Sequence, residues 1–136
     1  MAQGYLQEEG IDFDESFAPV ARLESIGLLL AITCQLGFKL HQMDVKSAFL
    51  NGFIKEVVYV EQPKGFEDPI YENHVYKLNK ALYGLKQAPR AWYDRLANFL
   101  MSKGYQRGSV DNTLFFKTLT NNGIIVAQVY VDDIIF

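Results

Sequence analysis

The sequence predicts an α+β fold in which helices pack on one face of a largely antiparallel sheet. Two stretches are predicted to be helices: residues 23–36 are apolar on most sides, and residues 89–103 carry one apolar stripe at helical spacing. The stretches between and after these helices are short, rich in Val, Ile and aromatic residues, and bounded by turn-forming residues, as strands are. The resulting order is helix, strand, hairpin, helix, hairpin, which is typical of α+β proteins. At 136 residues, the chain has the length of one domain with its own core.

The first predicted helix, residues 23–36, follows a connection without clear periodicity that occupies the first twenty residues. The helix is apolar on most sides, which predicts that it is buried, and Gly37 is placed to end it. A short strand is expected over residues 39–45, with Asp44 near its end. The dipeptide Asn51-Gly52 then indicates a turn.

Four further stretches are expected to form strands. Residues 56–61 and 75–78 are short and rich in Val and Tyr. Residues 114–118 and 124–131 are more apolar, and the turn-forming residues 121–123 between them predict a hairpin.

The most clearly defined element is a helix that begins at Pro89 and ends at Lys103. Proline suits the first turn of a helix, and Gly104 follows as a stop signal. One apolar stripe at i, i+4, i+7 and i+8 consists of Trp92, Leu96, Phe99 and Leu100. The helix is therefore amphipathic, and Trp92 is interpreted as part of its core face.

The composition is that of an ordinary soluble globular chain, with 49% apolar and 21% charged residues. No stretch is long and apolar enough to cross a bilayer, so no membrane partner is expected. The single cysteine, Cys34, excludes an intramolecular disulfide and fits a reducing compartment.

The net charge of −3 is unevenly distributed along the chain. Residues 1–76 carry 12 acidic and 5 basic side chains, residues 77–110 carry 1 and 7, and residues 111–136 carry 3 and 1. A local basic surface can attract phosphate groups even when the whole chain is acidic. The alternative is a solvated helix face with no ligand.

An acidic pair, Asp132-Asp133, interrupts the apolar stretch 126–136. Two like charges about 4 Å apart repel by roughly 4 kcal/mol at an effective dielectric of about 20. A divalent cation removes this repulsion, because hard cations bind carboxylate oxygens. A polar hairpin turn is the alternative interpretation, and the two are compatible.

Asp44 is a partner for this pair, because it ends a predicted strand and is followed by small residues. Three carboxylates at one sheet edge could hold two metal ions about 3.5–4 Å apart, as phosphoryl-transfer enzymes do. Other chemistries lack their signatures, since His41 and His74 are isolated and no phosphate-binding glycine loop or nucleophile elbow occurs.

Four segments resemble the reverse transcriptase of copia-type LTR retrotransposons. They are residues 17–24 (FAPVARLE), 42–52 (QMDVKSAFLNG), 82–93 (LYGLKQAPRAWY) and 130–133 (YVDD). Each alone is a weak signal, but four in the family's order are highly specific. The resemblance spans nearly the whole chain. It implies a polymerase palm, a ferredoxin-like antiparallel sheet with helices on one face, plus part of the fingers.

The resemblance also implies an RNA-directed DNA polymerase that uses two Mg²⁺ ions, with Mn²⁺ as a substitute. Asp44, Asp132 and Asp133 would be the catalytic carboxylates and metal ligands, and the Val45 carbonyl would be a further ligand. Asp44 and Asp132 are the ligands most directly implied.

Nucleotide and template contacts are implied for five further residues. Phe49 would lie under the incoming sugar and reject a 2′-hydroxyl by its size, although without the resemblance it would be interpreted as a core aromatic. Tyr83 and Gly84 would border the nucleotide and template, because glycine lets the backbone come close. Lys86 and Arg90 would lie near template phosphates.

Residues 1–136 would then be a palm and partial-fingers fragment truncated at both ends. In the family, a triphosphate-binding strand precedes this region, and a primer-holding segment, a thumb-like connection and ribonuclease H follow it. The expected partners are an RNA or DNA template-primer and a deoxynucleoside triphosphate. The ribonuclease H and integrase segments of the parent polyprotein, Pol, are expected as further partners. The expected location is intracellular: the cytoplasm, in a virus-like particle of the parent element, or the nucleus.

Three alternatives remain open from the sequence. The chain could be an inactive remnant that at most binds nucleic acid weakly through its basic segment. It could be another palm-like nucleotidyl enzyme, such as a cyclase, although residues 84–92 argue against this. It could also fail to fold stably, because its last strand would lack a partner and leave an apolar edge.

Overall fold

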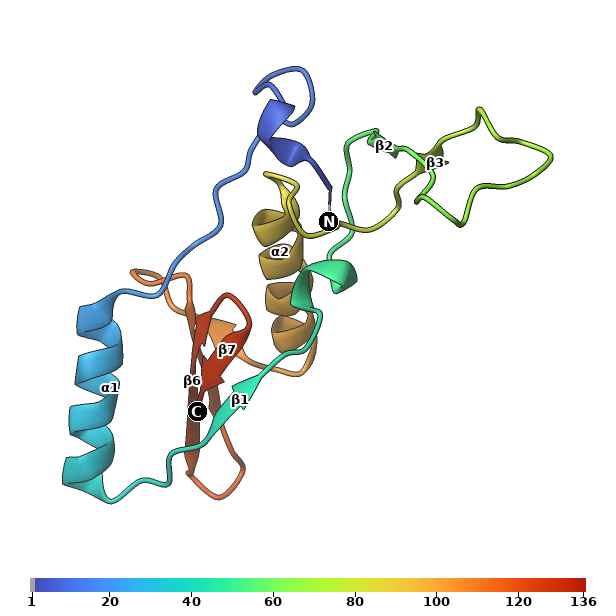
Figure 1. Cartoon of the computed structure of the whole chain (residues 1–136). Coiled ribbons are helices and arrows are strands. Elements are labelled where there is room, and N and C mark those ends of the chain that lie inside the picture. The colour runs from blue at the N-terminus through green and yellow to red at the C-terminus, as the bar shows by residue number, and fades with distance from the viewer. Residues whose placement is uncertain (1) are drawn as a thin grey trace.

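A computed structural model describes residues 2–136, which form two α-helices, seven short strands and two 3₁₀ turns (Figure 1). The helices are α1 (Leu23–Leu36) and α2 (Ala88–Ser102). The strands are β1 (Gln42–Asp44), β2 (Tyr59–Val60), β3 (Tyr76–Lys77), β4 (Gln106–Arg107), β5 (Leu114–Thr118), β6 (Ile124–Tyr130) and β7 (Asp133–Ile135). The 3₁₀ turns are η1 (Gly4–Leu6) and η2 (Ala48–Asn51). The α+β class and the largely antiparallel sheet are confirmed.

Five strands form one sheet in the order β1-β7-β6-β5-β4, and each neighbouring pair is antiparallel. The predicted hairpin is confirmed as β5 and β6. The last strand, β7, lies between β6 and β1 and is hydrogen-bonded to both. The expectation that this strand lacks a partner is therefore wrong. A two-residue turn folds β7 back onto β6, and β1, from 90 residues earlier, covers its other edge.

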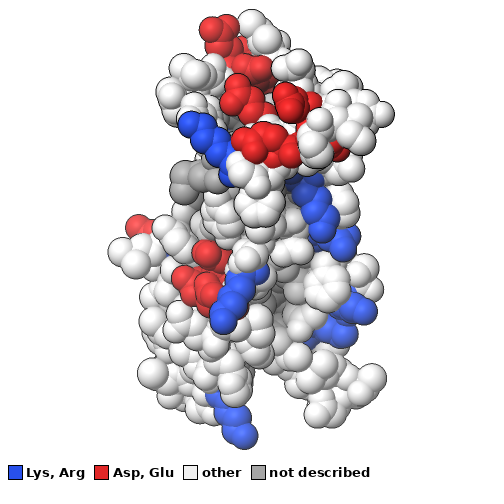
Figure 2. Space-filling view, turned by 45° about the vertical axis from the view of Figure 1, so that its right-hand side comes forward, with Lys and Arg blue, Asp and Glu red and all other residues white. Residues whose placement is uncertain are grey.

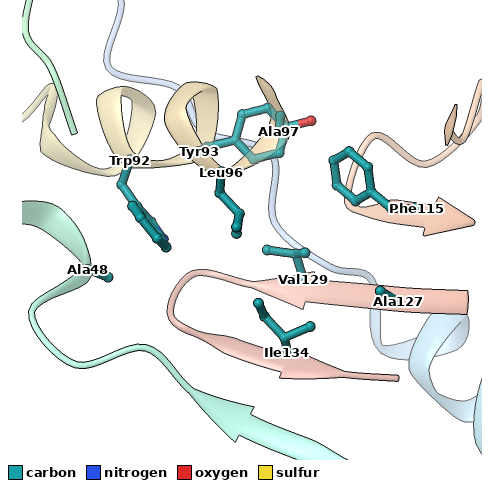
Figure 3. Packing of buried hydrophobic residues seen from close by; sticks show 9 residues of the cluster. All are labelled: Ala48, Trp92, Tyr93, Leu96, Ala97, Phe115, Ala127, Val129 and Ile134. Atoms are coloured by element: carbon teal, nitrogen blue, oxygen red, sulfur yellow. The ribbon is translucent and has the colours of Figure 1, made fainter. Parts of the chain in front are cut away.

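One face of this sheet packs against α2 (Figure 3). The core joins Trp92 and Leu96 of α2 to Phe115 of β5, Val129 of β6 and Ile134 of β7. Burying a large apolar side chain stabilises a fold by roughly 1.5–3 kcal/mol. This cluster therefore contributes to the stability of the fold, and it lies between α2 and the hairpin of β6 and β7.

The predicted stripe of α2 is confirmed only in part. Trp92 and Leu96 are buried, but Phe99 is 50% exposed. The buried face also includes Tyr93 and Ala97. The buried face is therefore rotated away from Phe99. Tyr93 and Ala97 lie on one side of the predicted stripe, and Phe99 lies on the other.

The first helix differs from its prediction. Figures 1 and 3 show α1 on the side of the sheet opposite α2, so the two helices do not share one face. Every residue of α1 is at least partly exposed, and Leu28 is 63% exposed. A sequence that is apolar on most sides predicted burial, but an open groove of about 350 Å³ separates the helix from the sheet, lined in part by Leu29, Ile125 and Phe136. The predicted stop is confirmed at Gly37, which has φ 65°.

A separate arm carries β2 and β3, each only two residues long (Figure 1). Gln62 holds the loop between them, because its Nε2 donates to the carbonyls of Tyr71 at 2.8 Å and His74 at 2.9 Å. The arm contains Glu61, Glu67, Asp68 and Glu72. Figure 2 shows acidic side chains gathered at this end of the molecule, with Lys and Arg below them.

No helix of residues 2–136 has the length and apolarity needed to span a bilayer.

Candidate active site

Asp44 and Asp133 lie directly opposite each other in the β1–β7 ladder. Side chains at directly opposed positions point to the same face, with Cβ atoms about 4.5–5.5 Å apart. Asp132 precedes this pair in the two-residue turn, and its carbonyl accepts a 2.8 Å hydrogen bond from the Val45 amide. The fold thus brings Asp44, Val45, Asp132 and Asp133 to one end of the sheet.

These carboxylates have almost no compensating partners. The two ion pairs formed within the described chain both involve Arg90, so neither neutralises this site. Gln42 Nε2 donates to Asp133 Oδ1 at a long 3.4 Å. Like charges directly opposed across two strands destabilise a sheet. The facing carboxylates therefore lower the stability of the sheet at this point, and a bound cation would remove that loss.

The side chains of the three carboxylates do not lie close enough together to bind one metal ion as they stand. Among residues 2–136, no three His, Cys, Asp or Glu side chains come close enough together to hold a metal ion. Asp44 is exposed and Asp132 and Asp133 are half-buried. The backbone brings the three acids together, but their side chains have not converged.

The turn between β6 and β7 has unusual backbone geometry. Val131 has φ 55°, a left-handed conformation that is a genuine outlier for a β-branched residue. Its carbonyl accepts a 2.7 Å hydrogen bond from Trp92 Nε1. Sequence reasoning assigned Trp92 to the core, which is confirmed, but it missed this contact. The available signal was that a buried indole N–H needs an acceptor.

The residues predicted to contact the nucleotide lie together. The rings of Phe49 and Tyr83 are 4.9 Å apart between centroids, with an interplanar angle of 45°. Phe49 lies in η2, and the Ala81 amide donates to the Gly52 carbonyl at 2.9 Å, which ties the two segments together. Gly84 follows at φ 100°, a conformation that favours glycine.

The two predicted phosphate contacts, Lys86 and Arg90, bind the chain's own N-terminal segment. Lys86 Nζ donates to the Gln7 carbonyl at 2.7 Å. Arg90 donates to the Phe17 carbonyl at 3.1 Å and pairs with Glu15 at 3.5 Å. A nucleic acid would compete with these contacts for both cations.

Gln87, which the sequence did not single out, is an unsatisfied buried group. It is 2% exposed, and neither its Oε1 nor its Nε2 has a hydrogen-bond partner in the described part of the chain. It lines a cavity of about 270 Å³ together with Arg90 and Asp94. Buried amides normally have partners, so this cavity has unmet hydrogen-bonding capacity.

Comparison with known proteins decides the family. A family described as "Reverse transcriptase (RNA-dependent DNA polymerase)" matches residues 1–136. The chain belongs to this reverse transcriptase family. The resemblance carried by the four sequence segments is thereby confirmed.

Curated relatives of this reverse transcriptase domain are transposon proteins. The chain is 44% identical over 135 residues to the retrovirus-related Pol polyprotein from transposon TNT 1-94 of Nicotiana tabacum, covering 99% of the chain and 10% of that protein. It is also 44% identical to the Pol polyprotein from transposon RE1 of Arabidopsis thaliana, covering 99% and 9%. The putative transposon Ty5-1 protein of Saccharomyces cerevisiae is 41% identical over 93 residues, covering 68% and 30%.

The reverse transcriptase domain therefore spans about a tenth of the length of its first two relatives. No solved structure matches the chain significantly.

Proposed function

We propose that residues 1–136 form the palm and part of the fingers of an RNA-directed DNA polymerase from a copia-type retrotransposon Pol polyprotein. The reaction would be attack of a primer 3′-hydroxyl on the α-phosphate of a deoxynucleoside triphosphate. The observation that carries this proposal is the facing pair of Asp44 and Asp133, with Asp132 in the adjoining turn. Membership of the reverse transcriptase family supports it.

The donor set fits divalent cations. Asp44, Asp132 and Asp133 offer carboxylate oxygens, Val45 offers a carbonyl, and within residues 2–136 no Lys or Arg forms an ion pair with these acids. Hard cations such as Mg²⁺ or Mn²⁺ prefer oxygen ligands. When bound, two such ions would stabilise negative charge on the attacking and leaving oxygens.

The chain's own residues would bind and orient the substrates. The packed rings of Phe49 and Tyr83 form a bulky wall suited to excluding a ribose 2′-hydroxyl. Gly84 lets the backbone approach the nucleotide or template. Lys86 and Arg90 would bind template phosphates after releasing the N-terminal segment.

The partners of this activity would be an RNA or DNA template-primer and a deoxynucleoside triphosphate. The curated relatives are Pol polyproteins, which supports further partners in the remaining Pol segments, ribonuclease H and integrase. The corresponding location would be intracellular, in a cytoplasmic virus-like particle or the nucleus.

A second candidate function is weak nucleic-acid binding by a catalytically inactive remnant. The unconverged carboxylates favour it, because two-metal chemistry needs them assembled. Its signature would be salt-sensitive binding of a primer-template duplex without nucleotide incorporation.

Binding of Mn²⁺, followed by electron paramagnetic resonance, tests the metal assignment. The parent chain is expected to bind Mn²⁺ more tightly than Asp44→Asn and Asp132→Asn do. Glu72→Gln is the matched control, because it removes one exposed negative charge from the arm and should leave binding unchanged. Equal binding by the parent chain and both Asn variants would refute the assignment.

A further inference from the structure

We infer that Trp92 is a positioning residue that fixes the turn carrying Asp132, through its indole N–H rather than through its bulk. That this positioning matters for metal binding and catalysis rests on the proposed function. The structural part, that one hydrogen bond from α2 sets the geometry of the turn, stands on contacts within the chain.

The contact is direct and partly buried. Trp92 is 6% exposed, and its Nε1 donates to the Val131 carbonyl at 2.7 Å. Figure 3 shows the indole pointing from α2 toward the turn that joins β6 and β7. A buried indole N–H costs stability when it has no acceptor, so this bond selects one orientation of the ring.

The acceptor is the group that orients Asp132. The Val131 carbonyl and the Asp132 amide belong to one planar peptide unit. Holding the carbonyl oxygen therefore fixes the plane that leads into the Asp132 Cα. The paired residues of the ladder, Tyr130 and Asp133, flank this peptide on either side.

The turn needs external support because its backbone is unfavourable. Val131 has φ 55°, where two-residue hairpins normally place Gly, Asn or Asp. Such conformations persist only when the surrounding structure over-determines them. Two hydrogen bonds from outside the hairpin provide this support: Trp92 Nε1 to the Val131 carbonyl, and the Val45 amide to the Asp132 carbonyl.

Trp92 is itself held in register with the segment that follows Asp44. A Cβ on Gly52 would lie 2.7 Å from both the Trp92 amide nitrogen and the Ala91 carbonyl carbon. This close approach sets α2 against the loop that carries Phe49. Trp92 therefore links the Asp44 segment to the Asp132 turn, which have to meet at one site.

The chain contains one tryptophan, so a tryptophan analogue incorporated during expression changes only this residue. 3-Benzothienylalanine keeps nearly the same shape but replaces the N–H by sulfur. 7-Azatryptophan keeps the N–H and serves as the matched control. Amide hydrogen exchange reports the turn, and Mn²⁺ affinity reports the carboxylates.

The benzothienyl protein is expected to exchange the Asp133 amide and the Val45 amide, which donates to the Asp132 carbonyl, about two- to tenfold faster, as the loss of one hydrogen bond predicts. Exchange in β5 should be unchanged in this protein, and the azatryptophan protein should match the parent at both places. Unchanged exchange at the turn would overturn the inference. Equally faster exchange in β5 would also overturn it, because Trp92 would then be only a core residue.

The metal measurement separates this inference from the proposed function. If Mn²⁺ binds the parent chain and Asp132→Asn loses it, the benzothienyl protein should bind about two- to tenfold more weakly. If the turn exchanges faster but the Mn²⁺ affinity is unchanged, the claim that Trp92 positions Asp132 for metal binding is overturned. If parent and Asp132→Asn bind Mn²⁺ equally, the proposed function fails, while hydrogen exchange still decides whether Trp92 fixes the turn.

Discussion

Asp44 of β1 and Asp133 of β7 are cross-strand partners in an antiparallel ladder, and neither forms an ion pair within residues 2–136. Opposed like charges lower the stability of a sheet. Strained or electrostatically unfavourable arrangements concentrate at functional sites. This pair is therefore the feature of the fold that most directly supports the proposed cation-dependent function.

Removing one charge of the facing pair should stabilise the metal-free protein. Asp44→Asn is expected to raise the free energy of unfolding by about 0.2–1 kcal/mol in the absence of Mg²⁺, because it relieves cross-strand repulsion. Added Mg²⁺ should stabilise the parent chain but not the variant, because only the parent keeps both carboxylates. Urea unfolding with and without Mg²⁺ measures both effects. Equal stabilisation of the two proteins by Mg²⁺ would contradict this account.

Adding a methyl group at Gly52 should disrupt the contact between η2 and α2. The new Cβ would lie 2.7 Å from backbone atoms of Ala91 and Trp92, which cannot move without shifting the helix. Gly52→Ala is expected to cost about 1–3 kcal/mol in the free energy of unfolding.

Gly27→Ala is the control for this substitution. Gly27 lies inside α1, and a Cβ there would meet no atom within 4 Å. It should stabilise the protein by about 0.5–1 kcal/mol, because alanine favours the helix. Urea denaturation of both variants gives the comparison, and a Gly52→Ala protein as stable as the parent would contradict the packing.

Asp111 should make stability depend on pH in the acidic range. Burial acts to raise the pKa of the Asp111 carboxyl, but hydrogen bonds from Thr113, Ser25 and Gln128 outweigh it and lower the pKa below its ordinary value. The folded state then binds a proton less readily than the unfolded state. The stability that Asp111 contributes is present above the unfolded pKa of about 3.9 and is lost as pH falls through the lower folded value.

The measurement is the free energy of unfolding of the parent and Asp111→Asn between about pH 5 and pH 3. The difference between the two proteins should shrink as pH falls. A constant difference across this range would show that the Asp111 carboxylate is not the titrating group.

The exposed apolar surface of α1 should drive self-association. Leu28 and Leu36 are 63% and 61% exposed, and large exposed apolar patches promote association. Replacing both by Gln should reduce association in sedimentation velocity and change the free energy of unfolding by only about 0.5 kcal/mol per site. Leu96→Ala, in the core, should cost about 2–5 kcal/mol in the same urea assay. Loss of stability in the α1 variant comparable to that of Leu96→Ala would show that α1 is buried in solution.

Local signals in the sequence predicted the elements that carry them. Pro89, the apolar stripe of α2 and the turn 121–123 each act within a few residues, and these elements are confirmed. The strand β4 was not predicted, because only two residues form it and two residues show no periodicity. The sequence did indicate a last strand after Asp133, but not its pairing with β1. Burial of α1 was predicted wrongly, since apolar composition shows that a helix can be buried but not what covers it.

The sequence singled out the residues of the candidate site, but it did not specify their geometry. Asp44, Asp132 and Asp133 attract attention because carboxylates interrupt apolar strands. Their meeting depends on the pairing of β1 with β7, a long-range contact that no local pattern specifies. The hydrogen bond from Trp92 to the turn is long-range in the same way, so the sequence indicated only a core residue.

Primer extension tests the central claim, that Asp44, Asp132 and Asp133 form a polymerase site, most directly. The assay uses an oligo-dT primer on poly-rA with Mg²⁺ and compares the parent chain, Asp132→Asn and Glu72→Gln. Incorporation of deoxythymidylate is expected with the parent and the Glu72→Gln control, and none is expected with Asp132→Asn. No incorporation by a folded parent would favour the nucleic-acid-binding remnant, whereas incorporation that survives Asp132→Asn would contradict the assignment of the carboxylates.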